Sequence, residues 1–181
     1  MYKIIRVFLI LVISLLSINI ICTDHVDAKA NLLSLHNIGA YEAANRMGAS
    51  SRFTKHGYES RLGLESYTCK VGLIPEAKGK FPDTIIYADN SGYVKAITFA
   101  YLEKQKKQVY PKIKNCIIGL YGNIDKALED SEQMKKYLAT AMVNKKGAYY
   151  KSTAEDCYYF FTVKDDDGVI SLTVTCTDTL R

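Results

Sequence analysis

The cysteines of this chain are the residues whose type and number most suggest chemistry. Residues 1–30 have the pattern of a secretory signal, and four cysteines follow them: Cys69, Cys116, Cys157 and Cys176. An even number of cysteines in an exported chain favours disulfides over a metal site. None has Cys-x-x-Cys spacing, and His36 and His56 lie far from all four in sequence, which disfavours a redox motif and a zinc site alike.

The final hairpin, residues 157–176, selects one cysteine pairing. Two runs rich in β-branched and aromatic residues flank an Asp-Asp-Asp-Gly turn at 165–168. Pairing Lys164 with Val169 places the apolar residues of both strands on one face and sets Cys157 opposite Cys176. We therefore predict a Cys157–Cys176 disulfide, which leaves Cys69–Cys116 as the second bridge by subtraction.

Candidate catalytic groups are few. The sequence has no Gly-x-Ser-x-Gly, His-Glu-x-x-His, P-loop or dinucleotide motif. The Asp-rich turn at 165–168 lacks the remaining ligands of a calcium loop. Glu155 and Asp156 are adjacent, so on a strand they would point to opposite faces, and a solvated bend is the favoured interpretation. A small hydrolase built from His36 or His56 with dispersed carboxylates is kept as an alternative.

The outer face of the last hairpin is the one surface that suggests a partner. It carries Tyr158, Phe160, Thr162 and Lys164, and aromatic residues on an exposed strand face are typical of protein contacts. The favoured interpretation is nonetheless that a helix packs there, because the helices expected below must dock on the sheet. A partner-binding face is the other interpretation.

The N-terminus has the organisation of a secretory signal. A short basic segment precedes an apolar run at 7–21, and Ala28-Lys29-Ala30 provides small residues for cleavage. We expect a cleaved leader at 1–30, no stable membrane insertion afterwards, and a single domain at 31–181 in the periplasm or secreted. The formal net charge is +5 with scattered lysines and no arginine-rich stripe, so nucleic acid is not an expected partner.

Hydrophobic periodicity predicts the elements that must position these residues. Helical spacing covers 31–47, 110–121 and 124–143, strand alternation covers 63–73, 83–102 forms a hairpin whose register stays open, and 148–152 is a short strand. Residues 48–61 are predicted to be a polar connector. The expected fold is α+β: an antiparallel sheet of about five strands from two hairpins, helices on one face, and two disulfides.

Residues 66–122 combine a strand, an Asp-x-x-Gly hairpin continuing as Gly-Tyr-Val-Lys-Ala-Ile, and a helix ending in Leu-Tyr-Gly. This organisation resembles uncharacterised small exported α+β domains of Gram-negative bacteria, and the resemblance implies no functional residue. The composition, with Lys far above Arg and no Trp, is typical of AT-rich bacterial genomes.

Together these observations favour an exported bacterial interaction protein without enzymatic activity or cofactor, binding another protein. A periplasmic binding module, a hydrolase inhibitor and a host-directed effector all fit. An envelope structural or assembly factor is a further alternative.

Overall fold

The computed structural model describes residues 32–60, 62–74 and 82–180. The predicted leader at 1–30 and most of the loop before Pro82 lie outside the described residues. Seven strands form one antiparallel sheet in the order β1-β2-β3-β4-β7-β6-β5. Their bounds are β1 Thr54–Glu59, β2 Leu64–Cys69, β3 Thr84–Ala88, β4 Val94–Leu102, β5 Ala148–Lys151, β6 Tyr158–Asp166 and β7 Val169–Thr177.

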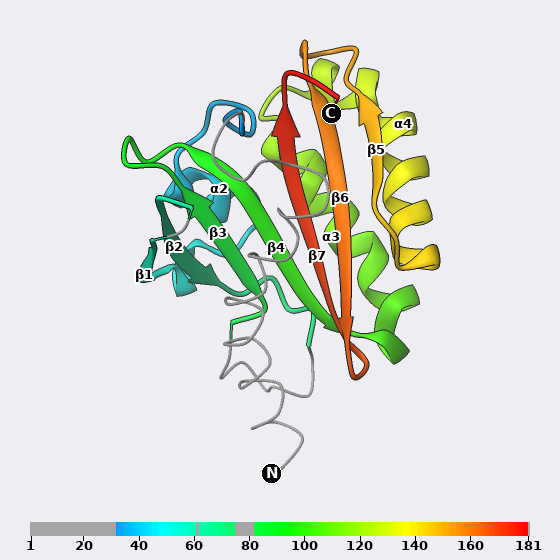
Figure 1. Cartoon of the computed structure of the whole chain (residues 1–181), viewed down its shortest axis with the longest axis horizontal. Helices are drawn as coiled ribbons and strands as arrows, with labels where there is room; N and C mark the ends of the chain where they lie inside the picture. Colours follow the sequence, from blue (N-terminus) through cyan, green and yellow to red (C-terminus); the bar gives the residue numbers. More distant parts are fainter. Residues whose placement is uncertain (1–31, 61, 75–81, 181) are drawn as a thin grey trace.

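Three α-helices lie on the same face of this sheet, behind it in the view of Figure 1. They are α2 (Ala40–Arg46), α3 (Lys106–Leu120) and α4 (Ile124–Asn144), with short 3-10 turns at Ser50–Arg52 and Glu103–Gln105. α3 buries Val109, Ile113, Cys116, Ile117 and Leu120 against the sheet. Because these residues recur every three or four positions, they form one apolar stripe, as helical periodicity predicts. The α+β class and the helices on one face are confirmed.

The prediction of about five strands is wrong. The sequence predicts a polar connector where β1 lies, because these residues are mostly polar, and in the structure most of them are exposed. An edge strand paired only with β2 needs no buried face, so its sequence carries little periodicity. A bulge at His56 interrupts the pairing between Lys55 and Gly57, a common way to keep a sheet edge from pairing further.

The first predicted helix is also shorter than expected. Only Ala40–Arg46 is helical, whereas residues 32–39 cross the ends of β4 and β7 as a non-helical segment with a turn at its centre, which we call the strap. Within it, His36 and Asn37 have φ angles of 52° and 51°, in the left-handed region that interrupts a helix.

The register of the last hairpin differs from the prediction by two residues. Val169 pairs with Asp166 rather than Lys164, and Cys176 pairs with Tyr159 rather than Cys157. The turn uses only Asp167 and Gly168, with φ angles of 53° and 81°, which is the two-residue turn that matches strand twist. Because side chains alternate with period two, this shift leaves every residue on the predicted face.

The hairpin β3–β4 separates bulky from small residues. Ile97, Phe99 and Tyr101 of β4 point into the main core under the helices, and Ala96 and Ala100 point to the opposite face. Every described helix lies on the face of the sheet that carries the bulky row (Figure 1). The helix expected over the outer face of the final hairpin is not found among the described elements.

Candidate functional site

A buried polar cluster connects the strap, the α3–α4 turn and the loop between β5 and β6. Its centre is Asp130 of α4, which is 0% exposed. The carboxylate accepts hydrogen bonds from the Ser152 hydroxyl (2.5 Å), from the backbone amide and hydroxyl of Thr153 (2.8 and 3.0 Å) and from the Ala154 amide (3.3 Å). A buried carboxylate is stable only with such donors. Asp130 therefore fixes the loop at 152–157.

Two tyrosines extend the cluster under the sheet. The Tyr121 hydroxyl donates to Asp130 over 2.9 Å and lies 2.9 Å from the Tyr150 hydroxyl. Because the single proton of Tyr121 goes to Asp130, Tyr150 donates in the second bond. Burial, together with the neighbouring Tyr150 and Asp130, raises the pKa of Tyr121, and burial raises the pKa of Tyr150. Both phenols are therefore neutral hydrogen-bonding groups at physiological pH.

The loop fixed by Asp130 holds Glu155 against the strap. We call His36, Glu155 and Tyr159 the buried triplet. Glu155 Oε2 accepts a 2.5 Å hydrogen bond from the Tyr159 hydroxyl, and Glu155 Oε1 lies 3.2 Å from His36 Nδ1. The His36 side chain is only 1% exposed and that of Glu155 is 23% exposed. The His36 ring also packs on Tyr121, with centroids 4.1 Å apart.

The electrostatics of the triplet favour an ionised Glu155. Burial acts to raise the pKa of Glu155, but the hydrogen bonds from His36 and Tyr159 outweigh it and the pKa falls below its ordinary value. Burial raises the pKa of Tyr159 strongly, and the neighbouring thiols and Glu155 add to the effect. Tyr159 is therefore a donor to Glu155 and does not act as a base.

The cysteines are brought together in the predicted combinations, but they are free thiols. The Cys157 and Cys176 thiols interact with each other, which lowers the pKa of Cys157 and raises that of Cys176. Burial raises the pKa of Cys69 and of Cys116 to about 12 each, and the charge of Asp83 adds to both. The predicted Cys157–Cys176 and Cys69–Cys116 disulfides are therefore wrong for this structure. Because of the two-residue register shift, Cys157 and Cys176 do not lie directly opposite each other on neighbouring strands.

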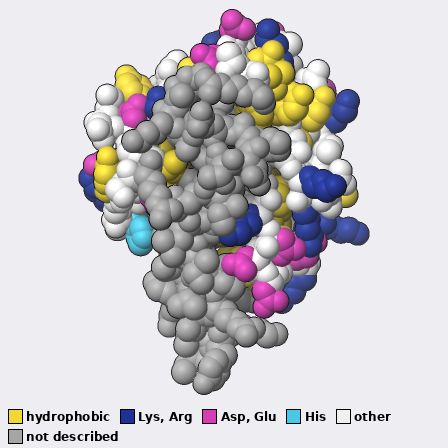
Figure 2. Space-filling view, in the orientation of Figure 1, with side chains coloured by type: hydrophobic (Ala, Val, Ile, Leu, Met, Phe, Trp, Pro, Cys, Tyr) yellow, Lys and Arg dark blue, Asp and Glu magenta, His cyan; other side chains and the backbone are white. Residues whose placement is uncertain are grey.

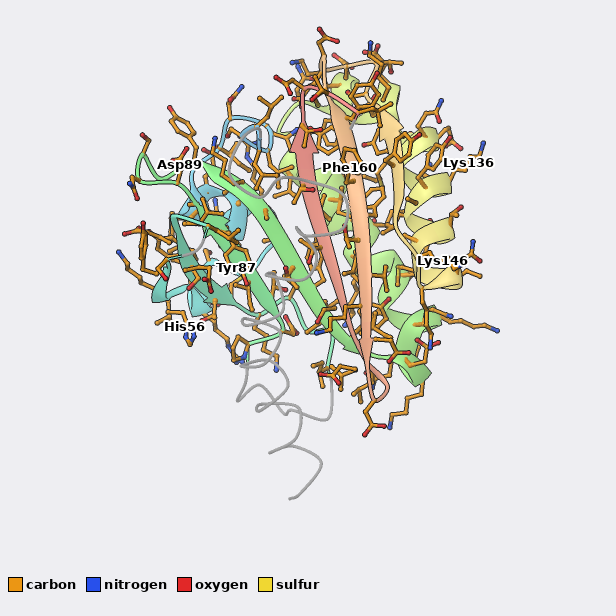
Figure 3. The ribbon with its side chains drawn as sticks, in the orientation of Figure 1. His56, Tyr87, Asp89, Lys136, Lys146 and Phe160 are labelled. Atoms are coloured by element: carbon orange, nitrogen blue, oxygen red, sulfur yellow. The ribbon has the colours of Figure 1, made fainter. Side chains whose placement is uncertain are left out.

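The cluster brings His36 and Glu155 together, as the hydrolase alternative required of one histidine. A hydrolytic base must also reach a substrate, and the His36 ring is enclosed by Tyr121, Tyr159 and Glu155. His56 lies exposed at the opposite sheet edge, on β1 (Figure 3). Within the described ranges, no group of three His, Cys, Asp or Glu side chains is arranged to hold a metal. The contacts of His36 therefore hold the strap against the loop at 152–157.

The predicted partner face lies on the side of the sheet opposite the helices. Tyr158, Phe160, Thr162 and Lys164 are all half-buried there. Phe160 stacks on Tyr149 of β5, with ring centroids 5.4 Å apart, and Tyr149 is 48% exposed. The Lys151 ammonium lies 5.8 Å from the centre of the Tyr158 ring. We call Tyr149, Tyr158 and Phe160 the aromatic patch. Figure 2 shows hydrophobic side chains gathered over this end of the sheet, with lysines and arginines along the adjacent margin.

Sequence reasoning missed Asp130, the most buried acid of the cluster. It was overlooked because it lies in a helix among other polar residues, and its partners are 9 to 24 positions away. The one available signal is its place on the apolar stripe of α4, four residues before Met134, which is fully buried. A charged residue on a buried stripe indicates an internal partner.

Comparisons with known proteins identify no relative: no family model matches the chain, and no curated protein or solved structure matches it. Across the described helices, none combines the length and apolar character needed to span a bilayer.

Proposed function

We propose that this chain is an exported bacterial protein, without enzymatic activity, that binds another protein through the aromatic patch. The observation that carries the proposal is the stacked pair of Tyr149 and Phe160, which stands on a sheet face over which no described helix lies. Aromatic side chains are enriched at the centres of protein interfaces because they bury much area with little loss of conformational entropy.

The surroundings of the patch favour a folded protein partner. Its neighbours on β6 and β7 are Thr162, Lys164 and Thr175, which are short or flexible side chains that leave the aromatic rings as the prominent feature. Lys151 beside Tyr158 adds a positive charge at the margin. An aromatic centre with a polar rim is the usual anatomy of an interface that forms between separately folded proteins.

Candidate roles that fit such a surface are a periplasmic binding module, an inhibitor of a hydrolase and a host-directed effector. All three place the protein outside the cytoplasm and require no cofactor. A hydrolytic role for His36 is not proposed, because the enclosed ring in the buried triplet offers no face to a substrate.

Site-specific photo-crosslinking tests the patch directly. A photoreactive phenylalanine analogue at position 160 should give a discrete adduct with a protein of the periplasm or the host, and an excess of unlabelled protein should suppress it. The matched control carries the analogue at Tyr58, an aromatic residue of β1 that is 58% exposed. Equal labelling from both positions would show that no specific surface exists at the patch.

Substitution gives the energetic test. The adducted partner, once identified, should bind the Tyr158→Ala plus Phe160→Ala variant at least 10-fold more weakly, because truncating buried aromatic contacts commonly costs about 2 kcal/mol each. The control variant is Tyr41→Ala, which removes an aromatic side chain that is 61% exposed on α2. Unchanged affinity of a folded double variant would move the binding site away from the aromatic patch.

A further inference from the structure

The strap fills the point where β4 and β7 separate. Strap amides donate to both strands, Leu33 to the Cys176 carbonyl (2.9 Å) and Leu35 to the Val94 carbonyl (2.8 Å), and the Val94 amide donates back to Ile38 (3.0 Å). These bonds satisfy backbone groups that β4 and β7 no longer provide to each other. The strap is thus a separate piece of chain inserted between two strands.

A left-handed turn in the middle of the strap carries His36 into the buried triplet. His36 and Asn37 both have left-handed backbone, a conformation in which His and Asn are enriched among residues other than glycine. Asn37 is exposed, whereas the His36 side chain is enclosed and bonded to Glu155. His36 fixes this turn through its contacts with Glu155 and Tyr121, alongside the backbone hydrogen bonds of the strap.

Charged and titratable groups reach Glu155 from every neighbouring element. The strap contributes His36, β6 contributes Tyr159, and Lys126 of α4 adds a positive charge. The thiols of Cys157 and Cys176 are also close enough to interact electrostatically with the Glu155 carboxylate. His36 and Lys126 favour the ionised carboxylate, and Tyr159 donates a hydrogen bond to it.

We propose that the strap is an acid-sensitive latch: protonation of Glu155 releases His36, and residues 32–39 then leave the space between β4 and β7. A neutral Glu155 no longer offers a carboxylate to the imidazole. The enclosed His36 ring then loses its charged acceptor, and a buried donor without a good acceptor is unfavourable. When the strap opens, water reaches both Glu155 and His36.

The direction of the pH effect follows from linkage. The closed strap depresses the pKa of Glu155 below the ordinary value of 4.5. Closure is therefore favoured by the full interaction above the ordinary pKa, and that contribution is lost as the pH falls through the depressed pKa. An open strap would uncover Leu33 and Leu35, of which Leu35 is fully buried while the strap is closed.

Hydrogen exchange measured by mass spectrometry on the full chain tests the latch. Protection factors, corrected for intrinsic exchange rates, should fall at least 10-fold for strap peptides between pH 5 and pH 3. Peptides from β3 and the centre of β4 should keep their protection over the same range. Parallel loss of protection in the strap and in these strands would indicate general acid unfolding and would overturn the proposal.

Two matched variants separate the latch from general charge effects. Glu155→Gln should lower strap protection at pH 7 and remove its dependence on acid. Glu65→Gln is the control, because Glu65 also accepts a tyrosine hydroxyl and faces a cation, and its side chain has similar exposure (28%). The control should retain the wild-type profile. A Glu155→Gln variant with the wild-type acid response would contradict the latch.

Discussion

Two carboxylates of this protein have the same kinds of partner, a tyrosine hydroxyl and a basic side chain, in very different surroundings. Each accepts a 2.5 Å hydrogen bond from a tyrosine hydroxyl on one oxygen and faces a basic side chain with the other: the edge triplet is Lys55, Glu65 and Tyr67, and the buried triplet is His36, Glu155 and Tyr159. The edge triplet lies within two paired strands and its lysine is 59% exposed, whereas the buried histidine is 1% exposed.

The comparison shows that the types of side chain in a contact do not by themselves determine how much the contact stabilises the fold. In both triplets the carboxylate pKa is lowered, by Lys55 and then Tyr67 at the edge, and by His36 and Tyr159 against the effect of burial in the interior. An exposed ion pair contributes little because water screens it and both side chains lose freedom. The buried pair joins residues 119 positions apart, so its loss frees a whole segment of chain.

The largest effect should come from removing the anchor that makes the buried triplet possible. Asp130→Ala leaves the Tyr121 and Ser152 hydroxyls and the loop amides without their acceptor, so we expect a loss of about 3 kcal/mol in the free energy of unfolding. Urea denaturation followed by circular dichroism measures it. Glu132→Ala, at an 85% exposed position of the same helix, is the control and should unfold as wild type. Equal midpoints for both variants would mean that the loop at 152–157 does not need Asp130.

The next test compares the two basic residues. His36→Ala should lower the free energy of unfolding by about 2 kcal/mol, because it removes the basic partner of the partly buried Glu155 carboxylate and creates a cavity beside Tyr121. Lys55→Ala should leave the urea midpoint unchanged, since its partner is already hydrated. Similar losses in the free energy of unfolding for both variants would show that the edge triplet stabilises the fold as much as the buried triplet does.

The sequence predicted the parts of the fold that depend on periodicity. The faces of β6 and β7 were correct even though the register was not, because a two-residue shift preserves alternation. The stripes of α3 and α4 were found for the same reason. β1 was missed because an exposed edge strand has no buried face to impose a pattern.

The buried triplet could not be predicted, since no spacing rule relates its members. Glu155 was assigned to a solvated bend from its neighbour Asp156, which is indeed 98% exposed. Only the loop conformation set by Asp130 turns Glu155 inward while leaving Asp156 in solvent. The spacing of Leu35 and Ile38 predicts the start of a helix, but in the structure both residues are buried from a non-helical backbone.

The smallest expected difference concerns the two tyrosine hydroxyls, and it isolates hydrogen bonding from charge. Tyr159→Phe removes one donor from Glu155 inside the protein, where the hydroxyl has no water to replace its partner, so we expect a loss of about 1–1.5 kcal/mol. Tyr67→Phe removes the equivalent donor from Glu65, but water takes its place at the exposed carboxylate, and the loss should be no more than about 0.5 kcal/mol.

Thermal unfolding at pH 7 compares the two variants. As the pH falls through the lowered pKa of Glu155 and its carboxylate becomes protonated, the cost of Tyr159→Phe should shrink toward that of Tyr67→Phe. If the cost of Tyr159→Phe were independent of pH, the hydroxyl would stabilise the fold through a neighbour other than the ionised carboxylate.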